Sequence, residues 1–314
     1  MPESAVRTFS DPDDYAASIN KSSTEVTVIG LGQFTAKLTR IDLHQLRIQR
    51  FSDNLPRIMH CISAPGRASL TFRTCPGPSL LWSGMEMHPS NIRRHAEGED
   101  AIQQSSGLAR GAAMSLPVEE WVRLAILGGC GLAPPKDPVT VTPAPGAMAK
   151  LQRLHAAAGA LAEYTPEIIS HPEAARSLEQ ALIEALVECL GEADPGEDRM
   201  AQRRHSLIMR RFRRAVEENP DRVLYIPELA AAIGVSNSTL RICCQEQLGM
   251  SPKRYLMLRH MHLARRALRD SAPGMTTVTE IATRYGFWEL GRFAVEYGSL
   301  FGEPPSATLR RARE

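Results

Sequence analysis

This 314-residue sequence has few aromatic side chains, only 5% of the total, and no apolar run long enough to span a bilayer. Its first residues are polar and acidic, without the apolar segment of a signal peptide. Its six cysteines form neither a Cys-x-x-Cys pair nor the cysteine and histidine spacing of a zinc site. These absences predict a cytoplasmic protein with free, mostly buried thiols and without a metal centre or a membrane partner.

Charge is distributed unevenly along the chain, although the net charge is only +2. Residues 203–314 contain 19 Lys and Arg against 11 Asp and Glu, a net charge of +8, whereas the first 202 residues carry −6. A basic C-terminal part joined to a mildly acidic N-terminal part favours a polyanion as the partner of the basic end.

Composition divides the chain into five predicted parts. Residues 1–23 are expected to form a flexible leader. Short β-branched segments separated by Gly, Pro, Asp and Asn predict strands of a barrel or sandwich over residues 24–130. Five prolines predict a stiff linker at 131–146. Helical periodicity predicts a connector or dimerisation region at 147–202 and an all-α domain at 203–314. The predicted fold class is therefore α+β.

One helix in the connector has an apolar stripe, which two interpretations explain equally well. Its residues fall near helical spacing: Ala174, Leu178, Leu182, Ala185, Cys189 and Leu190. The stripe would either pack on the preceding domain or pair with its copy in a homodimer.

Helix start and stop signals near the C-terminus predict a helix-turn-helix unit. A short helix ends at Gly234, and Ser236 caps a second helix over residues 237–248, which ends at Gly249. A longer helix begins at Pro252 and has about 18 residues, so it would span roughly 27 Å.

The same outline then repeats. Thr277 and Glu280 have the spacing of a capping box, and a helix over residues 289–301 follows. The scarce aromatic residues gather in this stretch, where we expect one buried helix face, formed by Leu290, Phe293, Ala294, Tyr297 and Phe301. Residues expected to hold the two units together are Leu240, Gly249, Pro252, Ile281, Ala282, Gly286, Phe287, Phe293, Tyr297, Phe301, Gly302 and Pro305.

The outward faces of the two reading helices carry side chains suited to DNA. A major groove admits one α-helix, and Arg can discriminate guanine by roughly 1–3 kcal/mol. Candidates for base contacts are Ser238, Arg241, Ile242, Gln245, Gly291, Arg292 and Val295. Candidates for phosphate contacts, which would set affinity rather than sequence preference, are Ser236, Ser251, Lys253 and Arg254. Glu289 and Glu296 would repel phosphates and would either reject wrong sites or contact cytosine.

The C-terminal third resembles a known family. The segments "LGMSPKRYL" and "TEIATRYGF", with "FGEPPS" after them, are similar to the DNA-binding domain of AraC-type (AraC/XylS family) regulators, over about Ser206 to Arg310. The resemblance implies a double helix-turn-helix that reads consecutive major grooves near promoters. It also implies an N-terminal domain, often a cupin-like barrel, that senses a small molecule or dimerises. Members often carry Arg where this chain has Ile242 and an aromatic residue where it has Cys244.

The predicted function is that of an effector-responsive transcription activator that binds double-stranded DNA as a homodimer and contacts RNA polymerase. One alternative keeps DNA binding but leaves the N-terminal domain only a dimerisation role. A second is a metal-dependent cupin enzyme with a nucleic-acid-binding tail. Its ligand motif is missing, since the scattered histidines (His44, His60, His88 and His95) form no HxH-plus-Glu set. No catalytic residue, metal or cofactor is therefore predicted, and the effector-binding residues stay unassigned.

Overall fold

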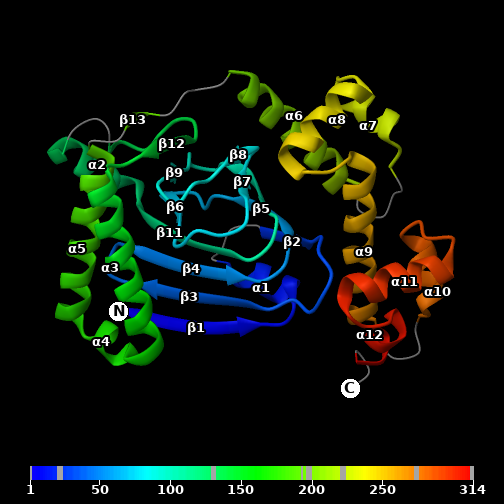
Figure 1. Ribbon diagram of the computed structural model, residues 1–314, viewed down its shortest axis with the longest axis horizontal. Helices are drawn as coiled ribbons and strands as arrows, with labels where there is room; N and C mark the ends of the chain where they lie inside the picture. The colour runs from blue at the N-terminus through cyan, green and yellow to red at the C-terminus, as the bar shows by residue number, and fades with distance from the viewer. Residues whose placement is uncertain are drawn as a thin grey trace.

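The protein combines a β-rich N-terminal part with an all-helical C-terminal domain, which confirms the predicted α+β class (Figure 1). This computed structural model describes residues 2–19, 24–128, 132–191, 194–195, 200–219, 224–271 and 276–311. The strands lie in the centre of Figure 1, with helices α2–α5 on one side of them and helices α6–α12 on the other.

Within the described residues, the strands pair into two antiparallel sheets. The larger sheet has the order β1 (Glu3–Phe9), β3 (Ala36–Asp42), β4 (Arg47–Asp53), β11 (Ala109–Pro117), β6 (Arg67–Arg73), β9 (Ile92–Arg94), β12 (Val139–Thr142) and β13 (Asp194–Pro195). The smaller sheet has the order β2 (Thr24–Val28), β5 (Arg57–Ile62), β10 (Asp100–Ser105), β7 (Leu80–Trp82) and β8 (Met85–Glu86). Because the strands form separate sheets, the predicted barrel is open.

Helices cover the outer face of the larger sheet. They are α2 (Val118–Gly128), α3 (Pro145–Tyr164), α4 (Pro166–Ser170) and α5 (Pro172–Gly191). Ile48 and Leu70 from the strands share one apolar core with Leu151 of α3 and Leu182 of α5. The apolar stripe of α5 is thus buried within the chain, as the first of the two open interpretations predicted. A homodimer would have to use another surface.

The flexible leader predicted for residues 1–23 is wrong for the residues described there. Strand β1 pairs antiparallel with β3, and helix α1 (Pro12–Ser18) follows it. Tyr15 is fully buried beside Phe9 and Phe34, at ring-centroid distances of 5.6 and 5.8 Å. Helix α1 has local start signals, since Asp11 accepts hydrogen bonds from the Asp13 and Asp14 N–H groups and Pro12 is the first helical residue. Strand β1, in contrast, depends on pairing with a strand that comes later in the chain. Residues 1 and 20–23 lie outside the described part.

The stiff linker predicted for residues 131–146 is also incorrect in its central part. Residues Val139–Thr142 form β12, which pairs with β9. The β-branched sequence "VTVT" can pair because Pro138 and Pro143 flank it and do not interrupt it. Helix α3 then begins at Pro145. Residue 131 and Cys130 lie outside the described part.

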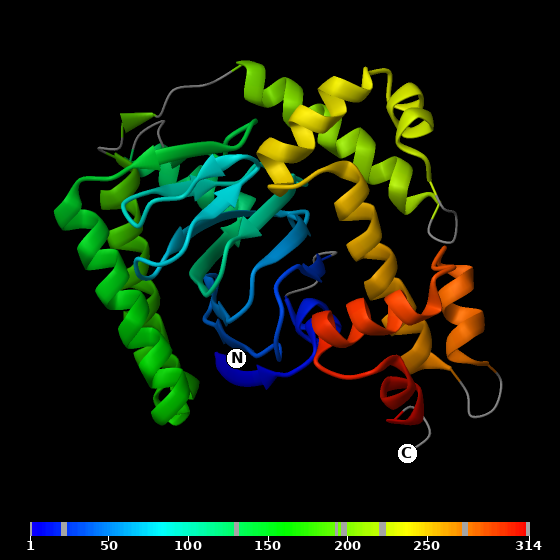
Figure 2. The same ribbon diagram turned by 45° about the vertical axis from the view of Figure 1, so that its right-hand side comes forward.

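The C-terminal domain contains seven helices among the described residues. They are α6 (Met200–Glu217), α7 (Ile226–Ala232), α8 (Asn237–Leu248), α9 (Pro252–Asp270), α10 (Val278–Arg284), α11 (Leu290–Phe301) and α12 (Pro305–Arg311). Helix α9 joins two separate apolar cores, since Tyr255 and Leu256 belong to the first and Leu258 and Met261 to the second. Figure 2 shows α9 running between the two helical groups. No helix of the described residues is both long and apolar enough to cross a membrane.

Candidate DNA interface

The first helix-turn-helix unit forms as its capping signals predict. Gly234 has a positive φ of 73° at the turn, and the backbone N–H of Thr239 donates to Ser236 Oγ at 3.1 Å. Helix α8 ends at Gly249, whose φ of 65° is a left-handed cap. Its inner face buries the predicted Leu240, Cys243, Cys244 and Leu248, and also Gln247.

The paired cysteines of α8 are free thiols in this core. Burial raises the pKa of Cys243, and it raises the pKa of Cys244 to about 12. Cys244 Sγ lies 3.8 Å from Met209 Sδ of α6. Both thiols are protonated at neutral pH and act as small apolar side chains.

The outer face of α8 carries the predicted base-contact candidates. Ser238, Arg241, Ile242 and Gln245 are all exposed, and Ile242 keeps 53% of its surface in solvent. An apolar side chain this exposed on a helix between polar neighbours is available for contact with a partner.

The second unit has the predicted capping box. The Glu280 N–H donates to Thr277 Oγ1 at 3.1 Å, and the Thr277 N–H donates to Glu280 Oε2 at 2.8 Å. Gly286 turns the chain with a φ of 86°. Helix α11 begins at Leu290, one residue later than predicted, with Glu289 at its cap position.

The predicted inner face of α11 was only partly right. Phe293 and Tyr297 are buried, but Leu290 and Ala294 are exposed, and Leu300 is buried in their place. The reason is that α12 folds back against α11, where Tyr297 Oη lies 2.8 Å from Thr308 Oγ1, and this shifts burial toward Leu300. The other predicted packing residues, Ile281, Ala282 and Pro305, are buried, whereas Phe287 and Phe301 are half-buried.

The outer face of α11 carries Gly291, Arg292 and Val295, which are exposed as predicted. Arg292 Nε lies 2.9 Å from Glu296 Oε1, and its Nη1 lies 3.6 Å from Glu289 Oε2. The two acids therefore hold the guanidinium over the outer face and would compete with a DNA partner for it. Trp288, from the aromatic-rich stretch, is not in the core but 82% exposed beside this face.

The phosphate-contact candidates cluster at helix starts. Ser236 caps α8, and Ser251 caps α9 by accepting a hydrogen bond from the Arg254 N–H at 3.3 Å. Lys253 and Arg254 are exposed on the first turn of α9. Helix N-termini and nearby cations are favourable surroundings for a phosphate.

The sequence did not reveal that one face of α9 is covered by the N-terminal domain. Tyr255 Oη lies 2.9 Å from His60 Nε2 of β5, and His262 Nε2 lies 3.1 Å from the carbonyl oxygen of Val28 at the end of β2. Both rings are fully buried, and burial lowers the pKa of each histidine to about 4.

Ion pairs complete the contact between the domains. Asp11 Oδ2 lies 2.6 Å from Arg265 Nη1, and its Oδ1 lies 2.6 Å from Arg269 Nη1. Burial alone would raise the pKa of Asp11, but the two arginines outweigh it and lower that pKa. On the other side of the interface, Arg213 of α6 pairs with Asp100 of β10. Acidic residues of the N-terminal domain thus neutralise part of the basic domain.

The smaller sheet separates a pocket from the helical C-terminal domain. On β10, Ala101 and Gln103 line the pocket, whereas Ile102 packs into the core of the first helix-turn-helix unit. Gln104 of the same strand lies so close to Gly249 that a Cβ there would clash with it. Because successive strand residues point to opposite faces, one strand contacts both the pocket and the reading unit.

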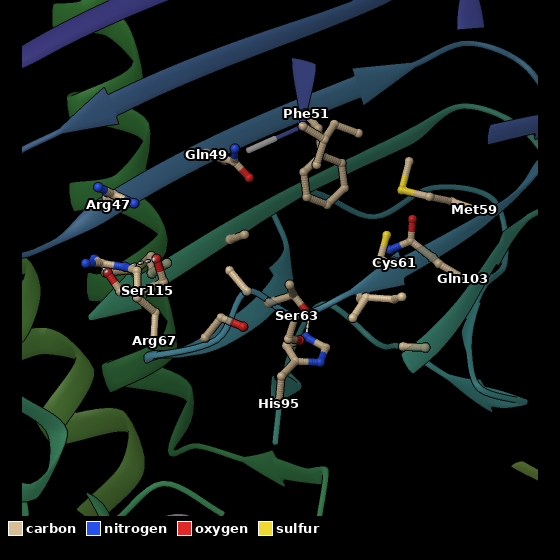
Figure 3. Close-up of a pocket in the computed structure, with 18 of the residues that line it drawn as sticks. Arg47, Gln49, Phe51, Met59, Cys61, Ser63, Arg67, His95, Gln103 and Ser115 are labelled. Carbon is tan, nitrogen blue, oxygen red and sulfur yellow. Dashed lines mark hydrogen bonds between the residues drawn. The ribbon is translucent and has the colours of Figure 1, made fainter. Parts of the chain in front are cut away.

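The pocket lies between the two sheets and is lined by side chains from both of them (Figure 3). Its polar wall includes His95, whose Nδ1 lies 2.7 Å from Glu99 and whose Nε2 lies 3.0 Å from Thr71 Oγ1. The described residues contain no group of three His, Cys, Asp or Glu side chains that could hold a metal ion. This pocket is a candidate site for a small molecule, and no sequence motif marked it.

The fold and its two outward helices define a class of protein in which a pocket-containing β domain is joined to a double helix-turn-helix domain. A helix-turn-helix domain model matches residues 229–311. An XylDLEGF operon transcriptional activator of Pseudomonas putida is 38% identical over 99 residues, which are 32% of this chain and 31% of that protein. A probable thc operon regulatory protein of Rhodococcus erythropolis is 40% identical over 95 residues, 30% of this chain and 29% of that protein.

One solved structure is also similar to this part of the chain. The crystal structure of a probable AraC family transcriptional regulator from Rhodopseudomonas palustris is 36% identical and covers 34% of this chain and 98% of its own, with a TM-score of 0.32. The C-terminal third of the chain is therefore a helix-turn-helix domain of the AraC type, similar to the matching part of AraC/XylS-family regulators. The match spans less than a third of the length of the two curated relatives named above.

Proposed function

We propose that this protein is a sequence-specific regulator of transcription that places α8 and α11 in two successive major grooves of double-stranded DNA. The observation that carries the proposal is the outward position of Arg241 and Arg292, one on each helix, above buried inner faces. Helix α9 joins the two units as a rigid spacer. Successive major grooves recur about every 34 Å along one side of a duplex.

The remaining contacts divide by role. Ser238, Ile242, Gln245, Gly291 and Val295 would approach base edges, since they share the outward faces with the two arginines. Ser236, Ser251, Lys253 and Arg254 would bind phosphates and give the sequence-independent part of the affinity.

The activity is proposed to be activation of transcription by a homodimer in the cytoplasm, in contact with RNA polymerase and controlled by a small molecule. The name of the Pseudomonas putida relative, an operon transcriptional activator, supports activation. The pocket behind β10 favours an effector over an N-terminal domain that only dimerises. The matched relatives are named as regulators, which favours a regulator over an enzyme.

The test is footprinting of the full-length protein across genomic DNA. We expect a few protected sites of about 20 base pairs, two adjacent major grooves for each protomer, upstream of genes. A homodimer should give two such half-sites in a fixed orientation. Uniform protection along the DNA would contradict sequence-specific reading. The double variant Asp11→Asn, Asp100→Asn removes the acids that pair with the helical domain and so loosens the contact between the domains. If neither the original protein nor this variant protects any site, the proposal is also contradicted.

A further inference from the structure

The pocket between the sheets has two chemically different ends. Figure 3 shows Arg47 and Arg67 together at one end, and Phe51, Met59 and Cys61 toward the other. The side chains come from strands of both sheets, with Arg47 and Phe51 on β4 and Met59 and Cys61 on β5. A ligand that fills this space would meet a charged wall at one end and an apolar wall at the other.

The charged end has an excess of positive charge. Arg67 donates to the carbonyl oxygens of Gln45 at 2.6 Å and Ser115 at 2.7 Å, which fix its position without neutralising it. Arg47 pairs with Asp42 at 3.0 Å at the rim. Burial and the neighbouring Arg47 lower the pKa of Arg67, as expected where two cations lie close together. None of the described residues that line the pocket is an Asp or a Glu.

The wall also contains buried polar atoms that lack a hydrogen-bond partner among the described residues. They are Gln103 Oε1, Trp82 Nε1 and Gln49 Nε2. Gln103 is only 2% exposed and Trp82 only 6%. A buried polar atom without a partner costs about 1–3 kcal/mol, so such atoms around a cavity indicate that a ligand or water completes them.

We propose that the pocket binds a small organic carboxylate with an apolar body and one further polar group. The carboxylate would accept hydrogen bonds from Arg67 and Arg47, since a guanidinium fork matches the geometry of a carboxylate. The apolar body would lie against Phe51 and Met59. The polar group would meet Gln103, the deepest of the unpartnered side chains.

This inference rests on the proposed function in one respect, which is that the carboxylate is taken to be the effector. Binding itself is measured without DNA, so the two can fail separately. Carboxylate binding without any change in the DNA footprint would leave the site in place and remove its regulatory role.

The experiment compares phenylacetate, cinnamate and octanoate with their primary amides, using calorimetry and thermal shift on the full-length chain. The amides keep the shape of the acids and remove the charge. We expect at least one acid to bind about tenfold or more tightly than its amide, a difference of about 1.4 kcal/mol. Arg47→Gln should reduce that preference and Arg67→Gln should abolish it, whereas Arg153→Gln on the exposed face of α3 should change neither.

Arg47→Gln is included because Arg67→Gln could disturb the fold. The Arg47 side chain is 40% exposed and pairs with Asp42 at the rim, so its replacement leaves the interior hydrogen bonds intact. Acids and amides that bind equally, or a preference that survives the Arg47→Gln and Arg67→Gln changes together, would overturn the proposal. The failure of every acid to bind would also overturn it. So would competition in which inorganic phosphate displaces a bound acid as effectively as a second organic acid does, because the site would then recognise any anion.

Discussion

Arg292 is the side chain on which most of the proposed sequence preference depends. It is exposed on α11, and in the DNA-free protein it is paired with Glu296 and Glu289. Such exposed pairs are worth only about 0–1 kcal/mol, less than the roughly 1–3 kcal/mol of a bidentate contact with guanine. The balance of these values favours exchange of the acids for a base edge on binding.

Replacement of Arg292 should therefore affect specific binding selectively. We expect Arg292→Ala to weaken binding to the footprinted site by about 1–3 kcal/mol and binding to unrelated DNA by much less. Competition gel shifts with both DNAs measure the difference. Arg176→Ala, at an exposed position on α5, is the control. An equal loss on the two DNAs would mean that Arg292 contacts a phosphate or supports the fold.

At the scale of elements, the short helices of the two helix-turn-helix units begin at, and are stabilised by, their capping residues. Helix α10 has only seven residues, Val278–Arg284, and its first turn is closed by the reciprocal bonds between Thr277 and Glu280. So short a helix has little intrinsic stability, and capping and packing must supply it.

Loss of the cap should destabilise the second unit. We expect Thr277→Ala to lower the free energy of unfolding by about 1 kcal/mol, because one N–H of the first turn loses its acceptor. Urea denaturation followed by circular dichroism measures this. Thr279→Ala, an exposed change within the same helix, should be neutral or slightly stabilising. Equal effects of the two changes would show that the cap does not stabilise α10.

These elements also show what sequence reasoning can reach. The bounds of α8 were predicted correctly because Ser236 and Gly249 are local signals. Strand β12 and the exposure of Leu290 were missed, because both depend on segments that are distant in sequence or fold back later. The base-contact candidates were correctly placed on exposed faces, but the buried face of α9 was not foreseen, since its partners lie in the N-terminal domain.

At the scale of the whole molecule, the two domains are joined by buried polar contacts along α9. His60 and His262 are fully buried there, and burial keeps the pKa of each near 4. Glu25 faces both rings and raises their pKa values, whereas Arg259 opposes it at His60 and Arg266 opposes it at His262. When the domains separate, each ring should regain its ordinary pKa near 6.5.

Domain contact should therefore weaken in mild acid. The separated form binds more protons, so the stabilisation is complete above about pH 6.5 and is lost as the pH falls toward 4. We expect a loss of about 2 kcal/mol for each histidine at pH 5. X-ray scattering should give a larger radius of gyration at pH 5.0 than at pH 7.5. The double variant His60→Gln, His262→Gln should remove this pH response, and a response that persists would assign it to other groups.

Strand β10 has a consequence for genetics. Its residues Ala101 and Gln103 border the pocket, and its residues Asp100, Ile102 and Gln104, which alternate with them, border the helical domain. In a screen for altered regulation, substitutions at the two pocket residues should give strains that no longer respond to the inducer. Those at the three residues facing the helical domain should give strains in which the target genes are expressed without it. Two opposite mutant phenotypes would then alternate residue by residue from Asp100 to Gln104.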